Sequence, residues 1–163
     1  MASRSGKVSH IQDKCLSSHC GGQVPRRGAP PGYVVSANIG NEANYVVIDH
    51  GDGTSALYLH LSAVEPAIKA KLQTGEPVQQ GDKIGLSGKT GWTQCGPHLH
   101  FQVQATSGIW YSQSKAITFA DSDVLAKSAS GVPPEGATVR SDNRGSVTPP
   151  PTPPPPTTPP PTT

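Results

Sequence analysis

Two histidines, His98 and His100, stand two positions apart in a segment that alternates between polar and apolar residues. Alternate side chains of a β-strand point to the same face, so both imidazoles are expected to project from one side of a strand. Imidazole is the commonest metal ligand and also the side chain best suited to move protons near neutral pH. The spacing therefore indicates a metal site or a proton-transfer pair, against the plain alternative of solvated surface histidines.

A third histidine, His60, lies in a second alternating segment, residues 55–61. In that segment His60 shares one face with Ala56 and Tyr58, and three leucines occupy the other face: Leu57, Leu59 and Leu61. If the two strands belong to one sheet, the three imidazoles gather on one exposed surface. A catalytic zinc ion takes three protein ligands and leaves one position open for water, so this grouping suggests a Zn²⁺ site.

Short β-strands separated by Gly-rich turns must position these histidines. Residues 45–48 form a β-branched run typical of a buried strand, and Asp52-Gly53 is a hairpin turn signal. Further strands are expected over 7–11, 83–87 and 98–104, and in the last of these Leu99, Phe101 and Val103 form the apolar face. Its polar face continues from the two histidines into Gln102 and Gln104, and Gln102 is a further candidate for lining a groove. The pattern predicts an all-β fold, an antiparallel β-sandwich or barrel-like core from about Lys7 to Phe119.

The C-terminal part of the chain has a different composition. We expect a β core over residues 1–120, a short helix within 121–129 followed by a linker to 148, and a Pro/Thr tail over 149–163. The region from about Gly131 onward is expected to be disordered, because its composition cannot bury enough apolar surface. Charged residues are 15% of the 163 residues and the net charge is +2, which favours no nucleic-acid partner. No stretch approaches the ~18 apolar residues of a membrane span.

Three motifs, in this order, resemble peptidase family M23, the lysostaphin/LytM type of zinc endopeptidase. They are NYVVIDHGDG at 44–53, LYLHL at 57–61 and GPHLHF at 96–101, and residues 75–85 resemble the family's Val-x-x-Gly-Asp-x-Ile-Gly stretch. The resemblance implies hydrolysis of the peptide cross-links of bacterial peptidoglycan. It also implies an antiparallel β-sandwich core with a groove along one sheet.

The resemblance assigns different roles to the three histidines. It implies that His100 is a zinc ligand, that His98 orients or deprotonates the attacking water, and that His60 stabilises the oxyanion. Spacing alone leaves open that His98 and His100 both hold metal. One Zn²⁺ is implied for each intact site.

The chain departs from the family pattern upstream of these motifs. The family takes its other two zinc ligands from a His-x-x-x-Asp motif, which is not present here. The nearest substitute, His10 to Asp13, is one residue too short and follows the wrong strand. Other potential ligands are Cys15, His19, Cys20 and Cys95, whose spacing matches no standard zinc module. Cys15 and Cys20 are equally compatible with a small disulfide in an oxidising compartment and with free thiols.

Two interpretations follow from the single matched ligand. The favoured one is a fragment of an M23 enzyme, inactive as given, with Zn²⁺ bound weakly or not at all, since all three histidines are kept. The alternative is a catalytically dead module that binds cell wall or regulates another wall hydrolase. A carrier domain of the biotinyl or lipoyl type shares the turn near Ile84 but lacks the Met-Lys-Met attachment site, because Met1 is the sole methionine.

The resemblance implies a peptidoglycan peptide as partner, without saying which cross-link is cut or what the oligomeric state is. It also implies an extracellular or cell-envelope location, although residues 1–6 lack the apolar stretch of a signal peptide.

Overall fold

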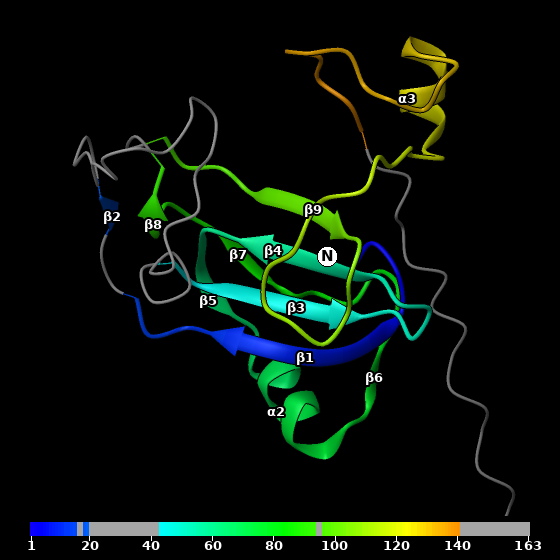
Figure 1. Cartoon of the computed structure of the whole chain (residues 1–163). Helices are drawn as coiled ribbons and strands as arrows, with labels where there is room; N and C mark the ends of the chain where they lie inside the picture. Colours follow the sequence, from blue (N-terminus) through cyan, green and yellow to red (C-terminus); the bar gives the residue numbers. More distant parts are fainter. Residues whose placement is uncertain (16–17, 20–42, 94–95, 141–163) are drawn as a thin grey trace, which may run out of the picture.

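The computed structural model describes residues 1–15, 18–19, 43–93 and 96–140 of the chain. In these residues the fold is mostly antiparallel β, as predicted (Figure 1). The main sheet has five strands in the order β6-β1-β3-β4-β9, and all its pairings are antiparallel. Its strands are β1 (Gly6–Gln12), β3 (Tyr45–Asp49), β4 (Ser55–Leu59), β6 (Pro77–Val78) and β9 (His100–Gln104). The sheet has two edges, β6 and β9, and so does not close into a barrel.

The central hairpin of β3 and β4 carries the core on both faces. Tyr45 pairs with Leu59 and Asp49 with Ser55, so the turn spans residues 50–54, where the Asp-Gly signal predicted it. Alternate residues enter two separate apolar clusters, the first including Val46, Ile48, Ala56 and Tyr58, and the second including Tyr45, Val47, Leu57 and Leu59. Because both faces are covered, the alternation in β4 does not mark a solvent side.

The predicted strand over residues 55–61 is wrong at its end. His60 has a φ of 68°, which ends β4 at Leu59 and starts a new strand, β5 (Leu61–Val64). This left-handed residue changes the alternation, so Leu61 packs with the cluster of Ala56 and Tyr58 instead of with the other leucines. β5 pairs with β7 (Gly85–Ser87) in a separate two-stranded sheet. Histidine is among the residues that tolerate this conformation best, although it is uncommon outside glycine.

A helix that the sequence analysis did not predict, α2 (Pro66–Thr74), packs against β1. Proline stands in its first turn, and Gly75, with a φ of 74°, ends it in the left-handed conformation, donating its N–H to the Lys71 carbonyl. Ile68 is the buried residue of the helix, so it has almost no amphipathic pattern. The proline and glycine at its two ends were the available signal.

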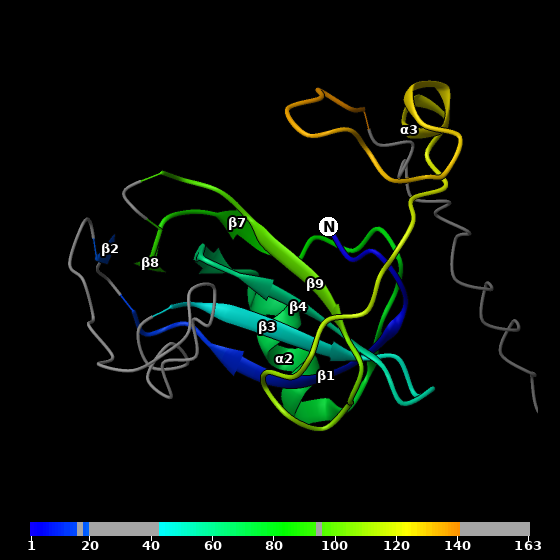
Figure 2. The same ribbon diagram turned by 45° about the horizontal axis from the view of Figure 1, so that its top comes forward.

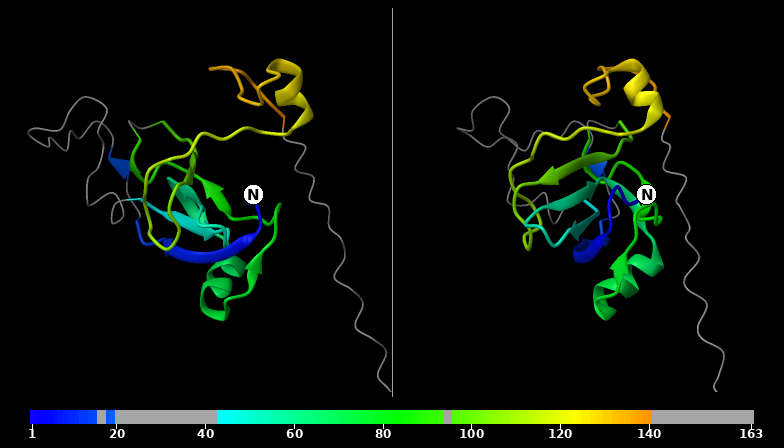
Figure 3. Two further views of the ribbon diagram at one scale, coloured as in Figure 1. Left: turned by 45° about the vertical axis from the view of Figure 1, so that its right-hand side comes forward. Right: turned by 90° about the vertical axis from the view of Figure 1, so that its right-hand side faces the viewer.

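The remaining described elements are short. β2 (Ser18–His19) pairs in parallel with β8 (Gly91–Trp92). The helix α3 (Ser122–Lys127) lies within the predicted 121–129, with Asp121 at the N-cap. It lies beyond the β9 edge of the sheet, whereas α2 lies next to β1 (Figures 2 and 3). No helix in the described ranges is long and apolar enough to cross a membrane.

Hydrogen bonds fix the segment after α3 further along the chain than the sequence predicts, as far as Arg140. The Phe119 N–H donates to the Gly131 carbonyl at 2.7 Å, and the Arg140 N–H donates to the Asp123 carboxylate at 2.5 Å. The expectation that order ends at Gly131 is therefore wrong for residues 131–140. The Pro/Thr tail over 149–163 lies outside the described residues.

Candidate functional site

The fold brings His60, His98 and His100 together. The ring centroids of His60 and His98 are 4.8 Å apart, and those of His60 and His100 are 6.0 Å apart. The pairing of Leu59 with His100 in the β4–β9 ladder is the cause, because it places His60 next to the start of β9. The expected clustering is confirmed, but the expectation of one exposed face is wrong. His60 is only 6% exposed, while His98 is exposed and His100 lies between these extremes.

His60 is fixed by a buried partner that the sequence analysis missed. Its Nδ1 lies 2.8 Å from the carbonyl oxygen of Thr90. A carbonyl oxygen only accepts, so Nδ1 carries the proton and Nε2 keeps a lone pair. The Thr90 hydroxyl accepts the Asn44 N–H at 3.0 Å and donates to the Leu61 carbonyl at 2.8 Å. These two bonds fix Thr90 and thereby the carbonyl that His60 contacts. The sequence showed a turn at 88–91 and no sign of this role.

The environment keeps His60 neutral. Burial lowers the pKa of His60 below its ordinary value, and the charges of His98 and His100 lower it further, while the bond to the Thr90 carbonyl acts in the opposite direction. At neutral pH His60 therefore offers Nε2 as a proton acceptor.

His98 lies just before β9, not within it. Its backbone N–H donates to the Gly88 carbonyl at 3.0 Å, which forms an isolated bridge across to the β7 side. Its Nδ1 lies 2.9 Å from the Gly96 carbonyl oxygen, so this ring also has its lone pair on Nε2. The predicted start of the strand at His98 is corrected to His100, because Leu99, 44% exposed, makes no ladder pair with β4.

The ring of His100 is hydrogen-bonded through Nε2, whereas those of His60 and His98 are bonded through Nδ1. Its Nε2 lies 3.0 Å from Oε1 of Gln102, which is 9% exposed. Gln102 and the fully buried Gln104 point into the protein, so the predicted polar face of this strand is not a solvent face and Gln102 does not line an open groove.

The described residues do not complete a metal centre. Within residues 1–15, 43–93 and 96–140, no group of three His, Cys, Asp or Glu side chains is arranged to hold an ion. His10 lies on β1, where it pairs with Val47 of β3. β1 is three strand spacings from β9, which separates His10 from His100 by about 14 Å at ~4.8 Å per spacing. Asp13 is ion-paired with Lys69. Neither residue substitutes for the missing motif, and the side chain of His19 together with Cys20 and Cys95 lies outside the described residues.

A cavity lies on the other face of β9. It has a volume of about 810 Å³, and its walls include Leu99, Phe101 and Val103 together with residues 117–121. None of the three clustered histidines lines it. The apolar face of this strand therefore lines the cavity, while the histidine cluster lies outside it.

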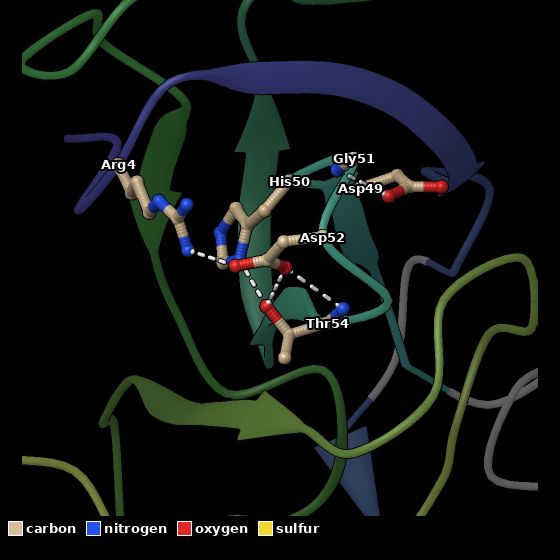
Figure 4. A network of polar contacts seen from close by, with 6 residues as sticks. All are labelled: Arg4, Asp49, His50, Gly51, Asp52 and Thr54. Atoms are coloured by element: carbon tan, nitrogen blue, oxygen red, sulfur yellow. Dashed lines mark hydrogen bonds and ion pairs between the residues drawn. The ribbon is translucent and has the colours of Figure 1, made fainter.

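A second polar network ties the N-terminal segment to the β3–β4 turn (Figure 4). The Arg4 guanidinium donates to Asp52 at 2.7 Å, and the Thr54 hydroxyl and N–H both donate to the same carboxylate, at 2.6 and 3.0 Å. The Thr54 hydroxyl bond, followed by that from Arg4, holds the pKa of Asp52 well below its usual range. His50 contacts Thr54 through Nδ1 at 2.9 Å, and it lies outside the histidine cluster.

Comparison with known proteins connects the cluster to a family. Residues 22–113, more than half of the chain and all three clustered histidines, match peptidase family M23. The peptidoglycan DD-endopeptidase ShyA of Vibrio cholerae is 43% identical over 70 residues, which cover 43% of this chain and 15% of that protein. The DD-carboxypeptidase/endopeptidase Mpg of Neisseria meningitidis serogroup B is 35% identical over 82 residues, which cover 50% and 17%.

The similarity covers less than a fifth of the length of each of these relatives. An uncharacterized metalloprotease of Haemophilus influenzae is similar on the same scale, 37% identical over 68 residues and 13% of its length. The family match over residues 22–113 includes β4 and β9, the two strands that bring the histidines together, and it covers more than half of the chain. The chain therefore belongs to peptidase family M23.

Proposed function

We propose that this chain carries the histidine half of the active site of a zinc metalloendopeptidase that hydrolyses peptide cross-links of bacterial peptidoglycan. The observation that carries the proposal is the convergence of His60, His98 and His100 within 6.0 Å of ring separation, in a family whose similar members are named as peptidoglycan endopeptidases. The same relatives support a location outside the cytoplasm, in the cell envelope or beyond it.

His98 is the proposed general base. Its Nδ1–H donates to the Gly96 carbonyl, which leaves the Nε2 lone pair as the proton acceptor, and the ring is exposed to solvent and to a substrate peptide. Removing a proton from water at this nitrogen yields an imidazolium. The rate gain from a positioned base of this kind is typically about 10²–10⁴.

His60 is the proposed oxyanion-stabilising residue, and its geometry adds a condition. In the neutral form its Nε2 has no proton to donate, because the proton is on Nδ1 and bonded to Thr90. It can stabilise a developing oxyanion as a hydrogen-bond donor only after it takes up a proton. The His98 ring centroid is 4.8 Å from that of His60, so we propose that the proton that leaves the water passes from His98 to His60.

His100 is the proposed zinc ligand. Its Nε2 is committed to Gln102, which leaves Nδ1 as the donor atom. A catalytic zinc takes three protein ligands, and the described residues offer no group of three, so the chain as given is proposed to bind Zn²⁺ weakly and to be inactive.

The absence of a three-donor group from the described residues also favours a second candidate function. In that alternative the chain is a non-catalytic M23 module that binds cell wall or regulates another wall hydrolase. Binding to insoluble peptidoglycan without any release of peptide would support it.

A paired experiment separates the two functions. The chain as given, and the chain extended at its N-terminus by a segment with His-x-x-x-Asp, are compared for Zn²⁺ affinity and for chelator-sensitive release of peptide from purified sacculi. We expect neither property in the first protein and both in the second. In the extended protein His100→Ala should abolish metal binding, whereas His98→Ala and His60→Ala should keep the metal and lose rate by about 10²–10⁴ each.

His50→Ala is the matched control, since His50 lies outside the cluster and should leave rate and metal affinity unchanged. Clear, chelator-sensitive hydrolysis by the unextended chain would show that other residues supply the ligands. It would refute the proposal of an incomplete site.

A further inference from the structure

Behind His100 lies a buried chain of amide side chains that leads away from the histidine cluster. Gln102 and Gln104 follow His100 at alternate positions of β9, and both are buried, Gln104 completely. Buried amides are costly unless each polar atom is paired, so the pairing of this chain is informative.

One backbone residue fixes the direction of both amides. The Ser112 N–H, which can only donate, lies 2.5 Å from Oε1 of Gln104. The Ser112 carbonyl, which can only accept, lies 3.1 Å from Nε2 of Gln102. The identity of the oxygen and the nitrogen in each amide therefore follows from the backbone.

The other contacts agree with this direction. The Gln104 Nε2 donates to the hydroxyl of the fully buried Ser55 at 3.1 Å, and this hydroxyl donates in turn to the Thr106 carbonyl at 3.2 Å. The Gln102 Nε2 also faces Oε1 of Gln104, at 3.5 Å. With Nε2 of Gln102 used as a donor, its Oε1 remains to accept from His100.

We propose that Gln102 and Gln104 are positioning residues for His100. The Ser112 backbone orients the two amides, and Oε1 of Gln102 then holds the His100 imidazole in the Nε2–H tautomer. The lone pair of His100 is then on Nδ1. This is the reverse of His60 and His98, whose Nδ1–H groups donate to carbonyl oxygens and whose lone pairs are on Nε2. The importance of this tautomer for catalysis rests on the proposed zinc-ligand role of His100, whereas the tautomer itself does not.

The test is nitrogen-15 NMR of the imidazole rings in the zinc-free chain, about two pH units above the ordinary histidine pKa of about 6.5. Protonated and lone-pair nitrogens have well-separated shifts, so each ring reports its own tautomer. We expect His100 as Nε2–H, with His60 and His98 as Nδ1–H in the same spectrum. A wild-type His100 with its proton on Nδ1 would overturn the proposal without any variant.

Variants separate positioning from a purely structural role. Gln102→Leu should lower the ratio of the Nε2–H to the Nδ1–H tautomer of His100 by about 5-fold, which corresponds to the loss of one net hydrogen bond. The tautomer ratios of His60 and His98 should not change. Gln102→Glu keeps an acceptor for His100 but faces the Ser112 carbonyl without a donor. It should therefore lower stability and still preserve the Nε2–H form.

A second position tests the relay itself. Gln104→Met removes the link to Ser55 and Ser112, and should shift the His100 ratio in the same direction as Gln102→Leu, by a smaller factor. An unchanged His100 tautomer in both folded variants would overturn the proposal, and so would its loss in Gln102→Glu. No hydrolysis or metal binding enters these measurements, so their outcome is independent of the proposed function.

Discussion

Gly88 follows β7, accepts the His98 N–H and lies against Ser62 of β5, where there is no room for a side chain. A Cβ at this position would lie 2.6 Å from the Ser62 backbone nitrogen and 2.7 Å from its Cβ. Both are far inside van der Waals contact, and the nearer atom is backbone, which cannot turn away. Overpacking of this kind costs about 1–3 kcal/mol, while Gly→Ala gains about 0.4–1 kcal/mol by restricting the unfolded chain.

Gly88→Ala is therefore expected to destabilise the fold by roughly 1–2 kcal/mol. Gly96→Ala is the matched control on the other side of His98, because its nearest contact would be the Thr93 carbonyl oxygen at an ordinary 3.6 Å. Urea unfolding followed by circular dichroism measures the free energy of unfolding of both variants, and thermal unfolding should show a change of about 4–8 °C in Tm for each kcal/mol. The reasoning fails if the two variants have equal stability, or if Gly96→Ala is the less stable one.

Two further substitutions test the core and the turn. Leu57→Ala leaves a cavity at a fully buried position on a central strand and should lower the free energy of unfolding in urea by about 2–5 kcal/mol. The control Leu72→Ala, at a 40% exposed position of α2, should change it by less than about 0.5 kcal/mol. Similar losses in the two variants would show that the β4 core is not packed as described. The lowered pKa of Asp52 means that its carboxylate stabilises the fold above the unfolded pKa of about 4 and that this contribution is lost as the pH falls toward the folded value. Asp52→Asn should therefore lower stability at neutral pH and flatten its decline between about pH 5 and pH 2, and a decline as steep as that of the wild type would contradict the assignment.

The strands that carry the histidines could be predicted because their apolar residues repeat with a period of two. The same period could not reveal that His60 leaves the strand, since a positive φ at one residue changes the faces that follow without changing the sequence pattern before it. Leu61 was assigned to the wrong face for this reason alone.

The burial of Gln102 and Gln104 was equally hidden. Polar residues at alternate positions predict a solvent face, and here that face is covered by the turn that follows the strand, with Trp110 and Tyr111 packed on the second apolar cluster. Long-range packing of this kind is not a property of any local window. α2 was missed because a helix with a single buried residue has no periodic signal to detect.

The β4–β9 ladder has a kinetic consequence. His60 and His100 approach each other only because Leu59 pairs with His100, and the chain between them contains β5, α2, β6, β7 and β8. Closing so long a loop costs entropy before the ladder returns any stabilisation, so non-local pairings of this kind form slowly. The imidazoles should therefore converge late in folding, and no peptide excised from either strand can reproduce the cluster. The register also moves in whole residues, and a slip of one residue turns each side chain to the opposite face, so the cluster forms completely or not at all.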